Sequence, residues 1–176
     1  MVFGPVLANH EVEKKVEDGE GGLFIIRSRE TPAGQELSVL YMDGDGQPVW
    51  NSDGISLTPP GHPLLQEARF SRQNELVVVW KDALPAGDEW RAQTLARSGQ
   101  RLWSDNGILL RDGAADSSQT RLSIGEKGQI DLMWEEVTAE GPHVRVRHWD
   151  SHGQLEKETV RRGTLADMPK FLPKSF

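Results

Sequence analysis

The sequence contains no cysteine and no long apolar segment. The first absence excludes disulfide bonds, zinc sites built on thiolates and thiol nucleophiles. The second argues against membrane insertion, because a spanning helix needs about 20 consecutive apolar residues. The opening stretch, MVFGPVLANHEVEKK, lacks the basic and apolar regions of a signal peptide. We therefore expect a secreted or periplasmic protein if a signal peptide has been removed ahead of this start, and a cytoplasmic one otherwise.

An excess of positive charge is also missing. The chain has 20 Lys and Arg residues against 27 Asp and Glu residues, for a net charge of −7. An acidic surface repels a phosphate backbone, and no basic stripe gathers on one face, so nucleic acid is not an expected partner. The length of 176 residues fits one ordinary domain or a few small repeating units.

Amphipathic helix patterns are lacking as well. The 18 glycines and 10 prolines gather in clusters such as DGEGG, TPAG and TPPGHP. Between the clusters lie short runs rich in β-branched and aromatic residues, such as LFII, LVVVW and IDLMW, which are typical of strands. The sequence therefore predicts an all-β fold, with only the first dozen residues and the stretch MPKFLPKSF outside the pattern.

An internal repeat organises these strands. Several residues recur at a spacing of 53 residues, and then again at 54 residues. The coincidences join Gly46 to Gly99 and Gly153, Trp50 to Trp103, and Trp80 to Trp134. Self-similarity at one such period is the signature of a repeat architecture.

Each repeat of about 53 residues has room for four antiparallel strands, as in a propeller blade. The first strand lies near EVEKKV, LLQEARFS and TRLSIG, and the second at LFIIR, LVVVW and IDLMW. The second strand is almost continuously apolar, so we expect both its faces to be buried. The third alternates, and the fourth is short. The expected boundaries are a lead-in over 1–8, repeats at about 9–61, 62–115 and 116–163, and a tail over 164–176.

The stretch DEWRAQTLARSGQRLWSDNGILL resembles a bacterial propeller-like repeat with the approximate consensus Asp-Ile-Tyr-Ala-Gln-Arg-Leu-Asp-x-x-Gly-x-x-Leu-Trp-x-x-x-Gly. The first copy has Arg27 where Trp80 stands in the second, and the third copy lacks the turn tryptophan. The resemblance covers about residues 9–163. It implies β-propeller-like blades and says almost nothing about activity, because such repeats occur in exported proteins of mostly unassigned function.

Three blades are fewer than the four to eight that close a propeller. Two chains could pair as a homodimer that completes a six-bladed ring. The chain could instead be a piece of a longer propeller, or a β-trefoil, which closes with three four-stranded units. The nearly continuous apolar run VVVW favours the propeller-like alternative.

Candidate metal and catalytic residues are few. His143 and His148 are five positions apart in one strand, so they face opposite sides and do not converge on a metal. Asp43 and Asp45 lie in a glycine-rich turn, but Pro48 and Gly54 occupy the positions where a helix–loop–helix calcium loop needs Gly and Glu. We expect a simple turn and no metal there, with a looser propeller-type calcium loop as the alternative. We also expect no cofactor and no catalytic residues, since no nucleophile elbow or phosphate loop is present.

The binding hypothesis is based on the positions of the tryptophans. Trp50 and Trp103 recur, so we expect them to pack between units. Trp80 and Trp134 end the second strand beside charged pairs, at the strand-end loops that commonly bind partners in propellers. The predicted binding residues are Trp80, Trp134, Arg27, Asp82 and Glu136.

These features predict a non-enzymatic binding or assembly module that recognises a protein partner, or a second copy of itself, through strand-end loops. The alternative is a carbohydrate-binding, lectin-like domain or a fragment of a glycan-processing enzyme. A third hypothesis is a purely structural segment of a larger exported protein.

Overall fold

The computed structural model describes residues 10–113 and 119–168, which form twelve β-strands and one short 3-10 helix. Blade 1 contains β1 (His10–Glu17), β2 (Leu23–Thr31), β3 (Gly34–Met42) and β4 (Ile55–Ser56). Blade 2 contains β5 (Pro63–Phe70), β6 (Glu75–Leu84), β7 (Gly87–Ala96) and β8 (Ile108–Arg111). Blade 3 contains β9 (Thr120–Ile124), β10 (Ile130–Thr138), β11 (Gly141–Trp149) and β12 (Leu155–Arg162), and the helix η1 (Leu165–Asp167) follows it.

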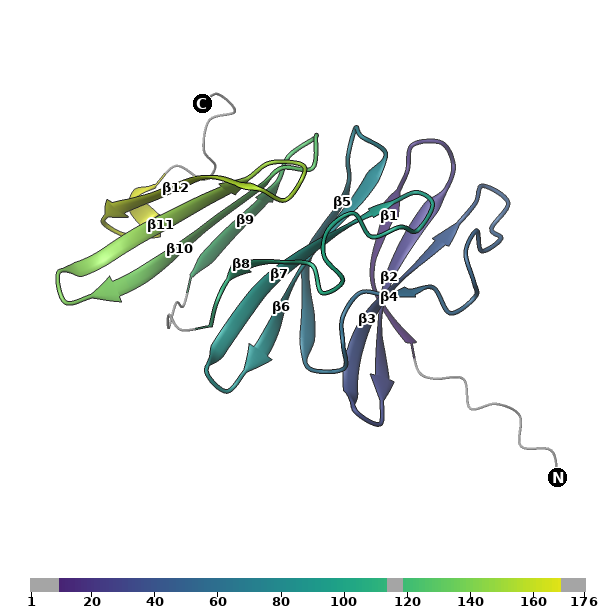
Figure 1. The fold of residues 1–176 in the computed structure, drawn as a ribbon, viewed down its shortest axis with the longest axis horizontal. Coiled ribbons are helices and arrows are strands. Elements are labelled where there is room, and N and C mark those ends of the chain that lie inside the picture. The colour runs from purple at the N-terminus through teal and green to yellow at the C-terminus, as the bar shows by residue number, and fades with distance from the viewer. Residues whose placement is uncertain (1–9, 114–118, 169–176) are drawn as a thin grey trace.

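The strand pairing confirms the predicted fold class. Each blade is a separate four-stranded antiparallel sheet whose strands pair in chain order. Figure 1 shows the three sheets side by side, with blade 2 between the other two. The β-trefoil alternative is wrong, because that fold closes its hairpins into a barrel and the described strands form three separate sheets instead. Each sheet falls within one expected repeat, and the lead-in over 1–8 lies outside the described residues.

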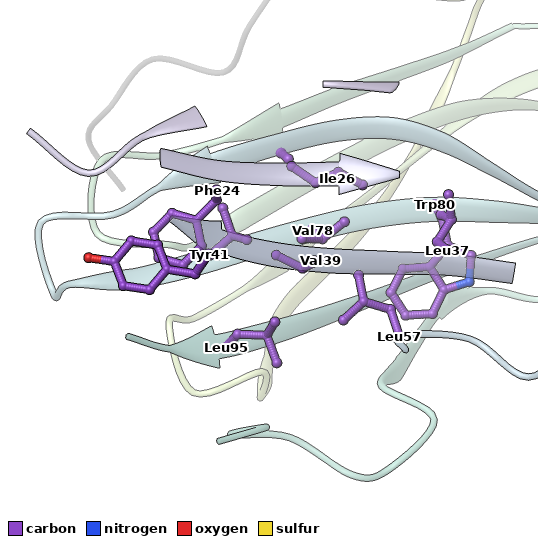
Figure 2. Close-up of a cluster of buried hydrophobic side chains, with 11 residues drawn as sticks. Phe24, Ile26, Leu37, Val39, Tyr41, Leu57, Val78, Trp80 and Leu95 are labelled. Atoms are coloured by element: carbon purple, nitrogen blue, oxygen red, sulfur yellow. The ribbon is translucent and has the colours of Figure 1, made fainter. Parts of the chain in front are cut away.

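Neighbouring blades interleave their side chains in two cores. In the first core, Phe24, Ile26 and Val39 of blade 1 pack with Val78 and Trp80 of blade 2 (Figure 2). The second core joins the other face of blade 2 to blade 3 and contains Val77, Val79, Trp90, Ala92, Leu110, Ile124, Ile130, Leu132, Trp134 and Trp149. The same kind of sheet-to-sheet contact is therefore made twice along the chain.

The middle blade is covered on both faces. Val77 and Val79 of β6 belong to the core with blade 3, whereas Val78 and Trp80 belong to the core with blade 1. All four are at most 1% exposed, which confirms the double burial expected from the continuous apolar run. Strand β2 of blade 1 instead alternates buried and half-buried residues, because only one of its faces meets another blade.

The far face of blade 3 is covered by the last part of the described chain. Leu165 of η1 is fully buried against Met133, Val144 and Val146. The carboxylate Oε1 of Glu135 accepts a hydrogen bond from the backbone N–H of Leu165 at 2.6 Å and holds the helix in place. No further blade of the described chain shields these apolar side chains, and η1 covers them instead.

A buried carboxylate ties blade 1 to blade 2. Asp18 is 7% exposed and accepts hydrogen bonds from the backbone N–H groups of Glu20 and Gly22, both at 2.8 Å, and from the hydroxyl of Tyr41 at 2.7 Å. Arg97 of blade 2 lies 3.4 Å away. Burial alone would raise the pKa of Asp18, but these hydrogen bonds and the arginine outweigh it and lower the pKa.

The first strands of blades 1 and 2 also share an ion pair. Lys14 of β1 bonds to Glu67 of β5, and the two residues occupy equivalent positions in successive repeats. Their side chains are 37% and 41% exposed, so water screens the pair and its contribution to stability is small.

Candidate interaction surface

The tryptophans predicted to bind a partner lie inside the fold. Trp80 is 1% exposed and Trp134 is 2% exposed. The indole Nε1 of Trp80 donates to Asp82 Oδ2 at 3.2 Å, and that of Trp134 donates to Glu136 Oε1 at 2.8 Å. A large aromatic side chain whose polar atom is satisfied internally is typical of core packing. Neither ring face is accessible, so any role of these two residues in binding is indirect, and the binding role stays a prediction.

Guanidinium groups surround the strand end of blade 3. Arg111 and Arg147 stack on the ring of Trp134, with their Cζ atoms 5.4 and 5.3 Å from the ring centroid. Arg145 donates to both carboxylate oxygens of Glu136, at 2.9 and 3.0 Å. This fork of hydrogen bonds, followed by that from Trp134, lowers the pKa of Glu136 against the opposing effect of burial.

At the equivalent strand end of blade 2, Asp82 accepts a hydrogen bond from Trp80 but has no bond from an arginine of the described chain. Burial raises the pKa of Asp82, and the hydrogen bond from Trp80 and the charge of Arg91 do not fully compensate. Arg91 instead bonds Glu89, with its Nε 3.0 Å from the carboxylate. Each carboxylate accepts the hydrogen bond of the buried indole beside it, and Glu136 also accepts two hydrogen bonds from Arg145.

The recurrent turn tryptophans reach across from one blade to the next. Trp50 of blade 1 donates from Nε1 to the carbonyl oxygen of Arg97 at 3.1 Å, and its ring lies over the turn at Gly99. Trp103 of blade 2 lies in the same way over the turn at Gly153. At the equivalent turn of blade 1, no described residue comes within 4 Å of the place where a Cβ of Gly46 would lie. The outer rim of blade 1 thus lacks the contact that covers the other two turns.

The acidic turn is held by its own backbone. Asp43 Oδ1 accepts hydrogen bonds from the N–H groups of Asp45 and Gln47, at 3.0 and 2.8 Å. Asp150 makes the same two bonds in blade 3, to His152 and Gln154. Across the described ranges, no three His, Asp or Glu side chains are grouped as a metal site would require.

One shallow depression of about 370 Å³ lies beside the β10–β11 hairpin. Its lining includes Glu136, His143, Arg145 and Val160. The charged groups are already engaged, because Arg145 bridges Glu136 and Glu158, and His143 Nδ1 lies 3.0 Å from a backbone carbonyl of its own hairpin. This depression therefore offers little unpaired chemistry to a ligand.

The face of blade 1 that points away from blade 2 is different. We call it the open face and define it by Leu23, Ile25, Arg27, Leu40 and Met42. Because side chains alternate along a strand, these residues lie opposite Phe24, Ile26, Val39 and Tyr41, which form the core with blade 2. Leu23 pairs with Met42 and Ile25 pairs with Leu40, so the four apolar side chains form one continuous, half-buried patch.

Repeat equivalence shows what covers this face in the other blades. Leu23 and Ile25 correspond to Leu76 and Val78 in blade 2, at a spacing of 53 residues. Those two residues are fully buried against the preceding blade. No described blade precedes blade 1, so the same apolar pattern remains half-exposed there.

Arg27 replaces the strand-end tryptophan on the open face. Its Nη2 donates to the carbonyl oxygen of Asp53 at 2.8 Å, while its Nε is buried and bonds no atom of the described chain. No carboxylate of the described residues lies within ion-pair distance of it, whereas its neighbour Arg29 bonds Glu36. Burial, and then the charge of Arg29, lower the pKa of Arg27. Of the predicted binding residues, Arg27 and Asp82 are half-buried and have no ion-pair partner among the described residues, and Arg27 is the only cation of the set.

Acidic charge lies at the opposite end of the open face. Glu17 of β1 pairs with Leu23, so the two side chains share this face, and Glu17 is exposed. Arg27 lies four residues further along β2, which corresponds to roughly 13 Å. The open face therefore carries an apolar patch between one basic and one acidic end.

The apolar patch is the part of this surface that sequence reasoning missed. The signal was available in the aligned repeats, since Leu40 stands where the later copies have Gln93 and Arg147. Gln93 Nε2 donates to the carbonyl oxygen of Ser104 in its own blade, whereas Arg147 reaches across to blade 2 and donates to the carbonyl oxygen of Leu110 at 3.0 Å. An apolar residue at this position distinguishes the blade that has no predecessor among the described strands.

Comparison with protein-family models and with curated proteins gave no match. The resemblance to bacterial propeller-like repeats therefore stays a prediction. Among the described residues, no helix is long and apolar enough to cross a membrane.

Proposed function

We propose that this chain is a non-enzymatic assembly module that binds a protein partner, or a second copy of itself, through the open face of blade 1. The observation that carries the proposal is the half-buried apolar patch of Leu23, Ile25, Leu40 and Met42, whose equivalents in blades 2 and 3 are covered by another blade. A contiguous exposed apolar patch is a common mark of a protein interaction site.

The energetics support this choice. Burying apolar surface stabilises a contact by about 25 cal/mol per Å², so covering four aliphatic side chains is worth several kcal/mol before the costs of association. The fold also treats its two ends differently. Blade 3 has polar groups and η1 over its far face, whereas blade 1 keeps the repeat pattern of a covered sheet without a cover among the described strands.

The other hypotheses have less support. Stacking on a sugar needs an exposed ring, and all six tryptophans are buried or half-buried. The two half-buried rings, Trp50 and Trp103, already lie over the turns of the next blade. The strand-end loops remain a second hypothesis with less support, because the charged groups that line the depression beside the β10–β11 hairpin are already paired with each other.

Site-specific photocrosslinking tests the proposal directly. A benzophenone amino acid replaces Leu40 on the open face, and a control chain carries it at the exposed Leu155 on β12. Irradiation of the purified chain and of cells that produce it should give a discrete intermolecular adduct from position 40 that is absent from position 155. An adduct confined within one chain, or no adduct from position 40 in either setting, would overturn the proposed function.

A further inference from the structure

We infer that the occupant of the open face is the open face of a second copy, packed with its strands antiparallel to those of the first so that Arg27 of each chain meets Glu17 of the other. This inference rests on the proposed function and names its partner. Three observations support it: the apolar patch, the cover that η1 forms on the far face of blade 3, and the separation of charge along the open face.

The helix η1, which covers the far face of blade 3, determines which symmetry the pair of chains can have. A head-to-tail ring of two chains would place the open face of one copy on the far face of blade 3 of the other. That far face is already occupied, because Leu165 is buried on Met133, Val144 and Val146 and is held by Glu135. An isologous pair needs only one self-complementary surface and closes at two subunits. Among the described blades, the open face is the one sheet face whose apolar side chains no other element covers.

The charges of Arg27 and Glu17 determine how the two open faces are oriented relative to each other. In the aligned class of sheet packing, the strands of the two sheets run within about 30° of each other, either parallel or antiparallel. A parallel arrangement would bring Arg27 against Arg27 and Glu17 against Glu17, which is repulsive at both ends. The antiparallel arrangement places the basic end over the acidic end twice, once on each side of the two-fold axis. It gives each Arg27 the carboxylate that none of the described residues supplies.

The remaining charges on this face are compatible with such a pair. Arg29 keeps its bond to Glu36 within the same chain. Lys15 pairs with Ile25 but lies on the edge strand β1 and is exposed, so its ammonium group reaches solvent at the border of the patch. The apolar patch then forms the dry centre of the interface, with charged residues at its rim.

The test is the absolute mass in solution, by light scattering on a sizing column over a tenfold range of protein concentration. One chain has a mass of 19.6 kDa. The wild type should shift from this mass toward twice this mass as the concentration rises. Arg27→Glu and Glu17→Arg, each alone, should raise the dissociation constant at least about thirtyfold, because every substitution removes both charge pairs. The double variant Glu17→Arg/Arg27→Glu should restore the wild-type constant.

Arg161→Glu, an exposed reversal on β12, is the matched control and should behave as the wild type. Tryptophan emission of every variant checks the fold, since the indoles are packed inside it. Masses that grow beyond two chains, a dimer that both single reversals leave intact, or a double variant that stays dissociated would each overturn the inference. A wild type that remains one chain also overturns it. If crosslinking from position 40 then still captures another protein, the proposed function stands with a different occupant.

Discussion

The contact between successive blades can be measured with one pair of equivalent glycines. Gly99 and Gly46 occupy the same turn position in their repeats, and both have left-handed backbone angles, with φ of 90° and 77°. A Cβ at Gly99 would lie 2.6 Å from Ile55 Cδ1 and 3.0 Å from the ring of Trp50, whereas a Cβ at Gly46 would meet no described atom within 4 Å. Alanine at the two positions therefore imposes a similar backbone cost and a different packing cost.

The expected magnitudes follow from this difference. A left-handed alanine costs about 1–2 kcal/mol, and this is the whole effect expected for Gly46→Ala. Gly99→Ala adds the cost of forcing a methyl group into a filled space, about 1–3 kcal/mol, because a tryptophan ring cannot yield as a flexible chain end can. With a urea dependence of about 2 kcal/mol per M, the unfolding midpoint of Gly99→Ala should lie about 0.5–1.5 M below that of Gly46→Ala.

The assay is equilibrium unfolding in urea, followed by tryptophan emission and by circular dichroism. Similar denaturant slopes in the two variants would show that the midpoints report stability alone. Equal midpoints for Gly99→Ala and Gly46→Ala would refute the reasoning. They would mean that Trp50 does not pack on the turn of blade 2, and that the recurrent turn tryptophan does not connect the blades.

Three further changes probe other contacts. Trp80→Ala should lower the free energy of unfolding by about 3–5 kcal/mol in the same urea assay, because it empties a fully buried site between blades 1 and 2. Asp18→Asn should flatten the acid limb of a stability profile: the folded pKa of Asp18 is lowered, so its stabilisation is present above the ordinary value near 3.9 and is lost as the pH falls through the folded value. A profile between pH 2 and pH 7 that is as steep in this variant as in the wild type would argue against that role. Lys14→Ala should change stability by less than about 1 kcal/mol, and a larger loss would show that its ion pair with Glu67 is less screened than its exposure indicates.

The strands were predictable because their signals are local. Alternation along LSVLYM, the glycine-rich turns and the spacing of 53 residues each depend on residues that are close in sequence, and the sheets follow them. The double burial of VVVW was predictable for the same reason, since a strand that is buried on both faces has apolar residues at successive positions. The short cap at Leu165 was not, because three helical residues carry no periodic signal and its role depends on where the chain folds back.

The candidate site was harder to predict, because it depends on which face of a blade is left uncovered. Trp80 and Trp134 stand beside charged residues in sequence at the ends of strands, which predicts a role in binding, yet alternation and packing turn both rings toward the preceding blade. The same argument explains Arg27. At the position where the later blades insert a tryptophan between sheets, blade 1 meets no other described blade, and a charged residue is tolerated there.

The most direct test of the open face is thiol labelling, because the sequence contains no cysteine and a single introduced thiol is the only one that reacts. Ile25→Cys and Val78→Cys place a single thiol at equivalent positions on the open face and in the core between blades 1 and 2. Thiol labelling followed over a wide range of protein concentration should be fast for Cys at position 25 in dilute solution, should slow as the concentration rises, and should stay slow for Cys at position 78 throughout. A thiol at position 25 that is protected even at the lowest concentration, or that labels equally fast at every concentration, would contradict the account of an open face that assembly covers.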